Sequence, residues 1–240
     1  MKSSPPEIAR DRPILAIIFR LFAAMTVALS FVIVKLAGSL HIGIPQVMFW
    51  RFIVCTVCLF AYLAIRRDLG ILRTRRPVSH FGRGLNSTII MALNYWAAMV
   101  IPIALVSTIN FTAPLFAVLI TSLVLRHPVS RVHWVAVLIG FVGVVLVSMP
   151  SPHDDYPLLG ALAALAGSAG TSVSNLQVRD LSRTEQPLAI AFYFSLIGAL
   201  LSALALPFST APTQPLEWLL LVSLGLQGMA FQVLFALSLR

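Results

Sequence analysis

The stretch that decides the fold runs from residue 94 to residue 150: NYWAAMVIPIALVSTINFTAPLFAVLITSLVLRHPVSRVHWVAVLIGFVGVVLVSMP. It contains two complete apolar runs, Ala104 to Leu125 and His133 to Met149, separated by a short polar segment. About twenty apolar residues in a helix cross the hydrocarbon core of a bilayer, which is about 30 Å thick. This stretch is therefore predicted to cross a membrane twice.

The same pattern extends along the whole chain, which is 59% hydrophobic and only 10% charged over its 240 residues. The mean hydropathy of +0.94 lies far above the balance of a soluble domain. The sequence therefore predicts an all-α polytopic membrane protein. Its eight predicted spans are Ile14 to Leu36, Gly43 to Ile65, Leu85 to Ile101, Ala104 to Leu125, His133 to Met149, Pro157 to Val178, Pro187 to Pro207 and Leu216 to Leu239.

The basic residues lie between the spans and predict the orientation of the bundle, since Lys and Arg in short loops stay on the cytoplasmic side. This distribution places residues 1–13 in a cytoplasmic tail. It also makes nucleic acid an improbable partner, although the formal net charge is +9. The residues assigned to the cytoplasmic side are Lys2, Arg10, Arg12, Arg66, Arg67, Arg73, Arg75, Arg76, Arg83, Arg126, Arg131, Arg179, Arg183 and Arg240.

The placement of acids and other reactive side chains argues against an enzyme and against coupling through a buried carboxylate. None of the predicted spans contains Asp or Glu in its interior, whereas proton- or sodium-coupled pumps commonly use such groups. The five histidines are scattered, so no catalytic cluster, metal site or cofactor is predicted. Cys55 and Cys58 form a C-x-x-C motif within an apolar run and are interpreted as small buried hydrophobes.

The two halves of the chain carry a faint internal repeat. The stretch FVIVKLAGSLHIGIPQVMFWRFIVCTVCLFAYLAI (residues 31–65) has a counterpart in SNLQVRDLSRTEQPLAIAFYFSLIGALLSALAL (residues 174–206). This alignment matches Pro45 with Pro187 and Arg51 with Tyr193. The first unit, residues 14–150, crosses the membrane five times, so the second unit, residues 157–240, begins on the opposite side. The two units are therefore predicted to be inverted repeats of five helices, an arrangement typical of transporters. The second unit then shows three of its five helices, and Arg240 is expected to be an interior position of the pattern.

Residues 94–150 resemble helices 3 to 5 of EamA-type members of the drug/metabolite transporter superfamily. The matching features are small residues from Ala104 to Thr108, a proline at Pro114, and glycine spacing at Gly140 and Gly143. VKLAGSLHIGIPQVMFWR (residues 34–51) is similar to the helix 1 to 2 region of the family. One departure is VLRHPVS (residues 124–130), where the family usually carries a glutamate.

The resemblance implies ten helices, with helices 1 to 4 and 6 to 9 enclosing a central cavity and helices 5 and 10 bracing the outside. It also implies transport of small metabolites or drugs across the bacterial inner membrane by alternating access. A homodimer is left open, and so is the alternative that the chain is a truncated, non-transporting remnant of the family.

Polar and aromatic side chains within the spans are the candidates for binding a solute. A buried amide or charge must be paired or must face water, so each either joins two helices or lines a cavity. Both interpretations remain open for Arg51, while Lys35 at the end of a span is expected at the membrane interface or the cavity. Pro114 is a candidate gating kink. The candidate binding residues are Arg51, Lys35, Asn94, Tyr95, Trp96, Asn110, Tyr193, Gln227 and Gln232.

Overall fold

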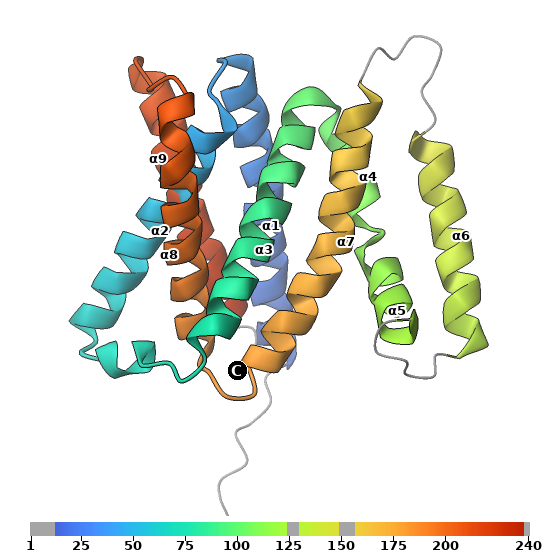
Figure 1. Cartoon of the computed structure of the whole chain (residues 1–240), viewed down its shortest axis with the longest axis horizontal. Helices are drawn as coiled ribbons and strands as arrows, with labels where there is room; N and C mark the ends of the chain where they lie inside the picture. The colour runs from blue at the N-terminus through green and yellow to red at the C-terminus, as the bar shows by residue number, and fades with distance from the viewer. Residues whose placement is uncertain (1–12, 124–129, 149–156, 238–240) are drawn as a thin grey trace, which may run out of the picture.

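The computed structural model describes residues 13–123, 130–148 and 157–237, and within these residues all regular structure is helical (Figure 1). Short connections join long helices into a bundle. The α-helices are α1 (Pro13–Ser39), α2 (Ile44–Ile65), α3 (Pro77–Val100), α4 (Ile103–Asn110), α5 (Ala113–Leu123), α6 (Arg131–Ser148), α7 (Leu158–Leu181), α8 (Pro187–Ala205) and α9 (Pro215–Leu237). Two 3-10 turns, η1 (Leu69–Leu72) and η2 (Leu206–Phe208), lie in the connections after α2 and α8.

The helix starts follow from local sequence. Proline occupies the first turn of α2, α3 and α8, where the N–H that it lacks would have no partner within the helix. At the start of α9, the Glu217 carboxylate accepts hydrogen bonds from the backbone N–H groups of Thr213 (2.6 Å) and Gln214 (3.2 Å). A glutamate side chain in the first turn that folds back in this way accepts hydrogen bonds from N–H groups that have no carbonyl partner within the helix.

Within the described residues, each predicted span coincides with a helix or, for the fourth, with the α4–α5 pair; the predicted ends at Leu125, Met149 and Leu239 lie outside these residues. Three segments of the described residues are long and apolar enough to cross a membrane by length and composition: Ile44–Ile65, Ile103–Ser122 and Pro187–Phe208. Eight crossings remain a prediction. One boundary was wrong: α3 begins at Pro77 and not near Leu85, so Arg83 lies within a helix and not in a loop.

The fourth span is broken into two helices, α4 and α5, between Asn110 and Ala113, close to Pro114. Serines of α7 bind the polar groups at this break. The Thr112 and Ser168 hydroxyls lie 2.7 Å apart, and Ser172 Oγ donates to the Ala113 carbonyl. A break of this kind is stable at membrane depth when neighbouring helices provide partners for the freed backbone groups.

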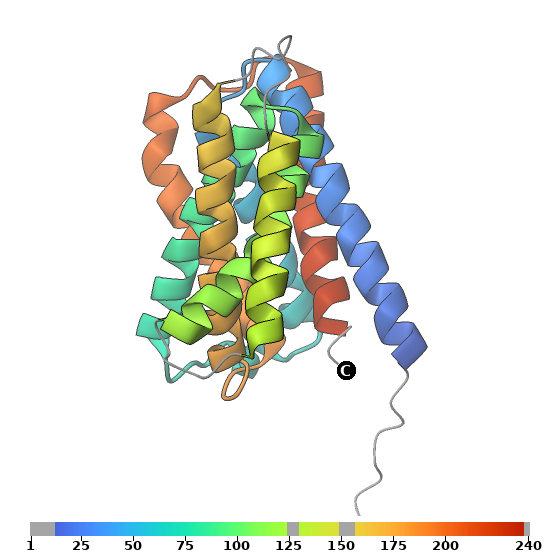
Figure 2. The same cartoon turned by 90° about the vertical axis from the view of Figure 1, so that its right-hand side faces the viewer.

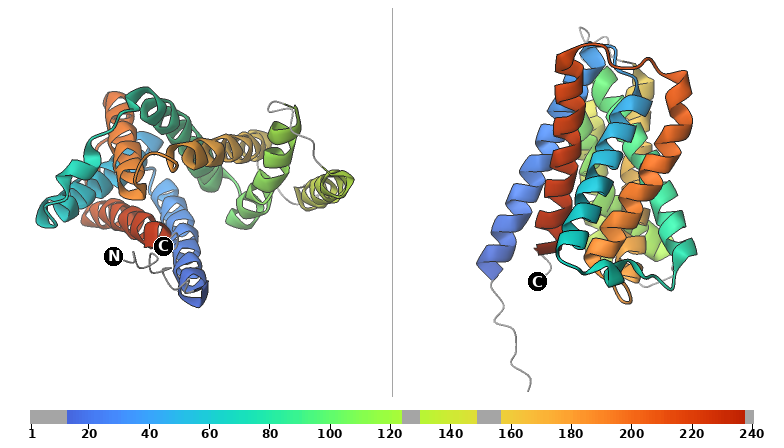
Figure 3. Two further views of the ribbon diagram at one scale, coloured as in Figure 1. Left: turned by 90° about the horizontal axis from the view of Figure 1, so that it is seen from below. Right: turned by 90° about the vertical axis from the view of Figure 1, so that its left-hand side faces the viewer.

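Helices of the first half pack mainly against helices of the second half. α3 lies against α7 and α8, and α9 lies against α1 and α2, while α2 and α8 pack against each other between them (Figure 3). Glycines permit the closest approaches: a Cβ at Gly167 of α7 would collide with the Asn94 amide of α3, and one at Gly225 of α9 would lie 2.5 Å from Val54 Cβ of α2. α6 stands at the side of the bundle against α4 and α5 (Figure 2).

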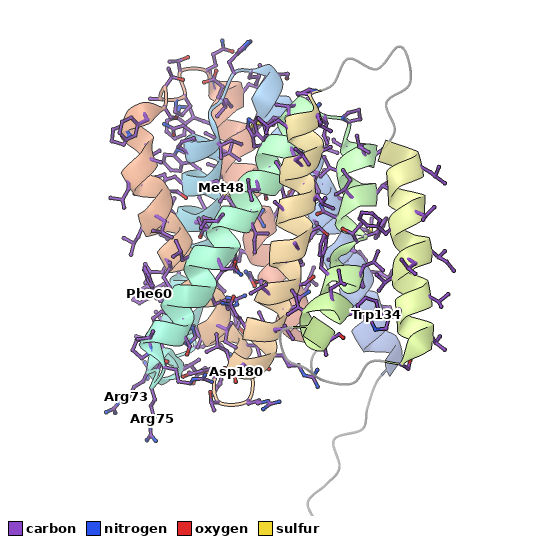
Figure 4. All side chains as sticks on the ribbon, turned by 45° about the vertical axis from the view of Figure 1, so that its right-hand side comes forward. Met48, Phe60, Arg73, Arg75, Trp134 and Asp180 are labelled. Atoms are coloured by element: carbon purple, nitrogen blue, oxygen red, sulfur yellow. The ribbon has the colours of Figure 1, made fainter. Side chains whose placement is uncertain are left out.

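The two ends of the bundle differ in charge. We call the end formed by η1 and the α7–α8 connection the arginine-rich end; it carries Arg66, Arg67, Arg73, Arg75, Arg76, Arg179 and Arg183. Arg73 and Arg75 point away from the helices there, and Asp180 lies nearby (Figure 4). Three contacts join η1 and the segment after it to the second half: Arg76 pairs with Asp180 at 2.6 Å, Thr74 Oγ1 donates to Glu185 at 2.7 Å, and Tyr193 donates to the Leu72 carbonyl at 2.6 Å.

Candidate solute-binding cavity

A cavity of about 470 Å³ lies between the two halves of the bundle. α1, α2, α3, α7, α8 and α9 all contribute to its walls, together with the last residue of α4. The lining combines hydroxyl and amide side chains with apolar and aromatic ones, as solute sites commonly do. Its residues are Val27, Ser30, Phe31, Arg51, Arg83, Ser87, Ile90, Met91, Asn94, Tyr95, Asn110, Thr171, Ser174, Asn175, Val178, Ser182, Pro187, Ile190, Ala191, Phe194, Phe231 and Gln232.

The cavity reaches from the arginine-rich end past the middle of the bundle. Ser182 and Pro187 of the α7–α8 connection line it at that end, and Arg51 near the start of α2 and Asn94 in the last third of α3 line it further in. The opposite end is filled by the main hydrophobic core, in which Val34 of α1, Val47 of α2 and Ala98 of α3 are buried. The structure is thus hollow toward one end and packed toward the other.

Arg51 lines the cavity from the second turn of α2 and is only 8% exposed. Its guanidinium Nη1 donates to Ser30 Oγ at 3.4 Å, and its Cζ lies 5.5 Å from the centre of the Tyr95 ring. Ser30 also lies 3.1 Å from Gln227 Oε1 of α9. A guanidinium has five N–H donors, so these contacts leave it capacity to bind a solute.

Arg83 is a second cation in the cavity wall, and it was not among the candidates predicted from sequence. It is 9% exposed, its Nη1 donates to the Ile190 carbonyl of α8 at 3.1 Å, and its Cζ lies 5.0 Å from the centre of the Phe194 ring. Its Nε has no hydrogen-bond partner among the described residues. The spacing of Arg83, Ser87 and Asn94 on one face of a helix is the signal that identifies this wall in the sequence.

Asn94 presents an amide to the cavity from the last third of α3. Its Nδ2 donates to the Ile90 carbonyl at 3.0 Å, while its buried Oδ1 has no partner among the described residues. Unpartnered buried polar atoms are uncommon, and a ligand is one of the recognised reasons for them. The structure thus brings five predicted residues to the lining, namely Arg51, Asn94, Tyr95, Asn110 and Gln232.

The other candidates predicted from sequence lie outside the lining. Lys35 Nζ donates to the carbonyls of Met99 (3.1 Å) and Ile101 (2.9 Å), so it holds the end of α3. The ends of helices leave carbonyls that need such a donor. The remaining three make contacts within the bundle: Gln227 with Ser30, Tyr193 with Leu72, and Trp96 with the main hydrophobic core.

The charged side chains of the lining are all positive among the described residues. Both of its ionic side chains, Arg51 and Arg83, are cations, and no Asp or Glu belongs to the lining within the described ranges. No group of three or more His, Cys, Asp or Glu side chains that could hold a metal ion was found in the part of the chain that the structure describes. The arrangement suits the binding of a solute.

Comparison with known proteins agrees with this architecture. The model of the EamA-like transporter family matches residues 14–149. The riboflavin transporter of Vibrio cholerae is 32% identical, over 84% of this chain and 69% of its own length. The S-adenosylmethionine uptake transporter of Rickettsia prowazekii is 26% identical over 91% of this chain and 72% of its own. The pseudopaline exporter CntI of Pseudomonas aeruginosa is 26% identical over 90% and 75%.

A solved structure shares the fold. A protein crystal structure with 22% sequence identity aligns with 93% of this chain and 78% of its own, with a TM-score of 0.63. Since the family match includes most of the stretch from residue 94 to residue 150, the relationship predicted from that stretch is confirmed.

Proposed function

Because the chain belongs to the EamA-like transporter family, we propose that it carries a small organic metabolite across the membrane through the cavity between its two halves. Relatives that share most of its length are transporters of small molecules, and the chain is a multi-pass membrane protein of the same kind. The observation that carries the proposal is a cavity lined by helices of both halves, in which polar side chains stand in a mainly apolar wall. By analogy with its bacterial relatives, we place it in the bacterial inner membrane.

We propose that transport proceeds by alternating access between two inverted repeats. The packing supports this: if α1, α2 and α3 correspond to α7, α8 and α9, the α3–α7 contact corresponds to the α9–α1 contact. The α3–α8 contact likewise corresponds to α9–α2, and the α2–α8 contact corresponds to itself. Such pseudo-symmetry lets two arrangements of similar energy open the same site to opposite sides.

In this proposal the described arrangement is the one open toward the arginine-rich end. Since Lys and Arg accumulate on the cytoplasmic side, that end faces the cytoplasm. The opposite end, filled by the main hydrophobic core, must separate when the cavity opens outward. The break between α4 and α5 near Pro114, beside the cavity residue Asn110, serves as the flexible point of this motion.

Arg51, Asn94, Tyr95, Asn110 and Gln232 are the proposed solute-binding residues. Lys35, Trp96, Tyr193 and Gln227 support the walls behind them. The lining contains no carboxylate in the described ranges, which favours facilitated transport or exchange over proton coupling through this cavity.

The test is counterflow in vesicles that contain the purified chain, with labelled riboflavin and S-adenosylmethionine as the first solutes. We expect internal unlabelled solute to increase the uptake of the labelled solute, and Arg51→Gln to lose this uptake. The matched control is Arg73→Gln, which removes an arginine that points away from the bundle. Flux through protein vesicles no greater than through empty ones, for every solute tried, would favour a non-transporting member of the family.

A further inference from the structure

We propose that the transported solute is an organic anion, and that Arg83 together with the first turn of α8 binds its carboxylate or phosphate group. This inference rests on the proposed function and specifies its substrate class. It concerns the part of the cavity nearest the arginine-rich end, whereas Arg51 lies further from the α7–α8 connection.

Arg83 has the properties of a binding group without its ligand. The side chain is more than nine-tenths buried, and its Nε has no partner among the described residues. Among the described residues, the guanidinium of Arg83 donates one hydrogen bond, to the Ile190 carbonyl, and its other N–H groups remain available to a ligand. A snorkelling arginine would place its guanidinium in water or among headgroups, but this one lies over the Phe194 ring inside the bundle.

The first turn of α8 adds a second favourable element for an anion. Pro187 and Ile190 of that turn line the same cavity. Pro187 has no N–H and Ile190 donates to the Gln186 carbonyl, so the N–H groups of this turn that have no acceptor within the helix are those of Leu188 and Ala189. They give the start of the helix a partial positive charge that stabilises carboxylate and phosphate groups. Ser87 and Ser174 of the lining share a hydrogen bond of 2.8 Å, and the hydroxyl that accepts it keeps its own O–H as one further donor.

The absence of a counter-ion completes the argument. Within the described residues the lining holds two guanidinium groups and no carboxylate, and the nearby acids have other partners: Asp180 pairs with Arg76, and Glu185 accepts from Thr74. A buried charge is costly unless it is paired, so an anionic ligand is the group that this wall lacks. The aromatic rings of Phe31, Tyr95 and Phe194 then contact the apolar body of the solute.

The experiment compares two probes that differ by one phosphate, riboflavin and riboflavin 5′-phosphate. Binding to the full chain in phosphatidylcholine nanodiscs is followed by flavin fluorescence at low and high salt. We expect the phosphate form to bind about tenfold more tightly at low salt, since charge-assisted hydrogen bonds are worth this much. High salt should reduce the preference, and Arg83→Gln should bring the affinity ratio close to one.

Two further variants separate charge from folding. Arg83→Lys keeps a cation and should retain part of the preference, and Arg73→Gln should retain all of it. Inorganic phosphate gives a readout independent of flavins: at constant ionic strength it should raise the melting temperature of the wild type more than that of Arg83→Gln. Equal flavin affinities in the wild type, or an unchanged ratio in Arg83→Gln, would overturn the proposal, and so would equal phosphate shifts in both proteins.

A lipid headgroup could offer the same phosphate chemistry, so a second arm uses nanodiscs that contain phosphatidylglycerol. If native mass spectrometry finds that lipid retained by the wild type and lost in Arg83→Gln, while phosphate and flavin phosphate have no effect, the site serves lipid and the proposal fails. Counterflow of a neutral solute that survives in Arg83→Gln would leave the transport function standing in either case.

Discussion

Replacing Gly167 by alanine tests the closest approach between α3 and α7. An added Cβ would collide with the Asn94 amide, and its next neighbours would be Asn94 Cγ at 2.9 Å and Oδ1 at 3.2 Å. The amide would have to leave its place, and with it the hydrogen bond to the Ile90 carbonyl would be lost. Overpacking of a tight contact costs about 1–3 kcal/mol, and the lost hydrogen bond adds about 1 kcal/mol.

Part of this cost is returned, because alanine is a better helix former than glycine by about 1 kcal/mol. We therefore expect Gly167→Ala to lower the free energy of unfolding by about 1–3 kcal/mol. Denaturant titration in mixed micelles, followed by circular dichroism, measures it. The matched control is Gly82→Ala in α3, where a Cβ would meet nothing within 4 Å. That variant should be as stable as the wild type or slightly more stable.

A double variant identifies the cause. Asn94→Ala removes the side chain that the new Cβ would strike, so Gly167→Ala combined with Asn94→Ala should recover most of the stability lost through the collision. Such a recovery appears as a coupling energy between neighbouring sites. If Gly167→Ala were as stable as Gly82→Ala, or if Asn94→Ala gave no recovery, the described packing of α3 on α7 would be refuted.

Three other substitutions test contacts away from the cavity lining. Lys35→Met removes the donor to two carbonyls at the end of α3, so we expect a loss of about 1.5–3 kcal/mol in unfolding free energy. Solute affinity measured in the same preparation should change little. A loss of affinity without a loss of stability would show that Lys35 binds the solute. Thr112→Val removes the hydroxyl that contacts Ser168 at the α4–α5 break, and denaturant titration should show a loss of about 1–2 kcal/mol; an unchanged midpoint would contradict the described contact. Arg76→Ala breaks an ion pair with Asp180 in which the two side chains are 35% and 55% exposed, so the free energy of unfolding should fall by less than about 1 kcal/mol. A larger loss, measured by thermal unfolding, would contradict the expectation that an exposed pair contributes little.

The helices themselves were predictable because their signal is local. Long apolar runs with proline at their starts locate α2, α8 and the other helices within a few residues. The start of α3 was missed because residues 77–84 (PVSHFGRG) mix polar residues and glycines with only two large apolar ones, and a search for apolar length does not extend into them. Pro77 is the local signal for this start, and the contact of Arg83 with the Ile190 carbonyl of α8 adds a partner that is distant in sequence.

The cavity was predictable only in part, because the residues that line it are selected by partners distant in sequence. Asn94 and Tyr95 were found from the cost of polar groups in the middle of a span. Tyr193 and Lys35 were also chosen as polar side chains of a span, Lys35 at its end, yet they turn toward a loop carbonyl and a helix end. The sequence shows that a polar side chain within an apolar span needs a hydrogen-bond partner, but it does not show whether that partner is another part of the protein or a solute.

The dominance of contacts between the two halves has a consequence for biosynthesis. Helices α1, α2 and α3 leave the ribosome first, yet the neighbours that each of them contacts most lie in α7, α8 and α9. Membrane insertion of the early helices can proceed one by one, since each satisfies its own backbone hydrogen bonds. Their assembly must wait until the last of these neighbours has been inserted. During this interval the buried arginines of α2 and α3 lack their final surroundings, so the nascent chain is expected to depend on insertion factors that shield polar groups from lipid.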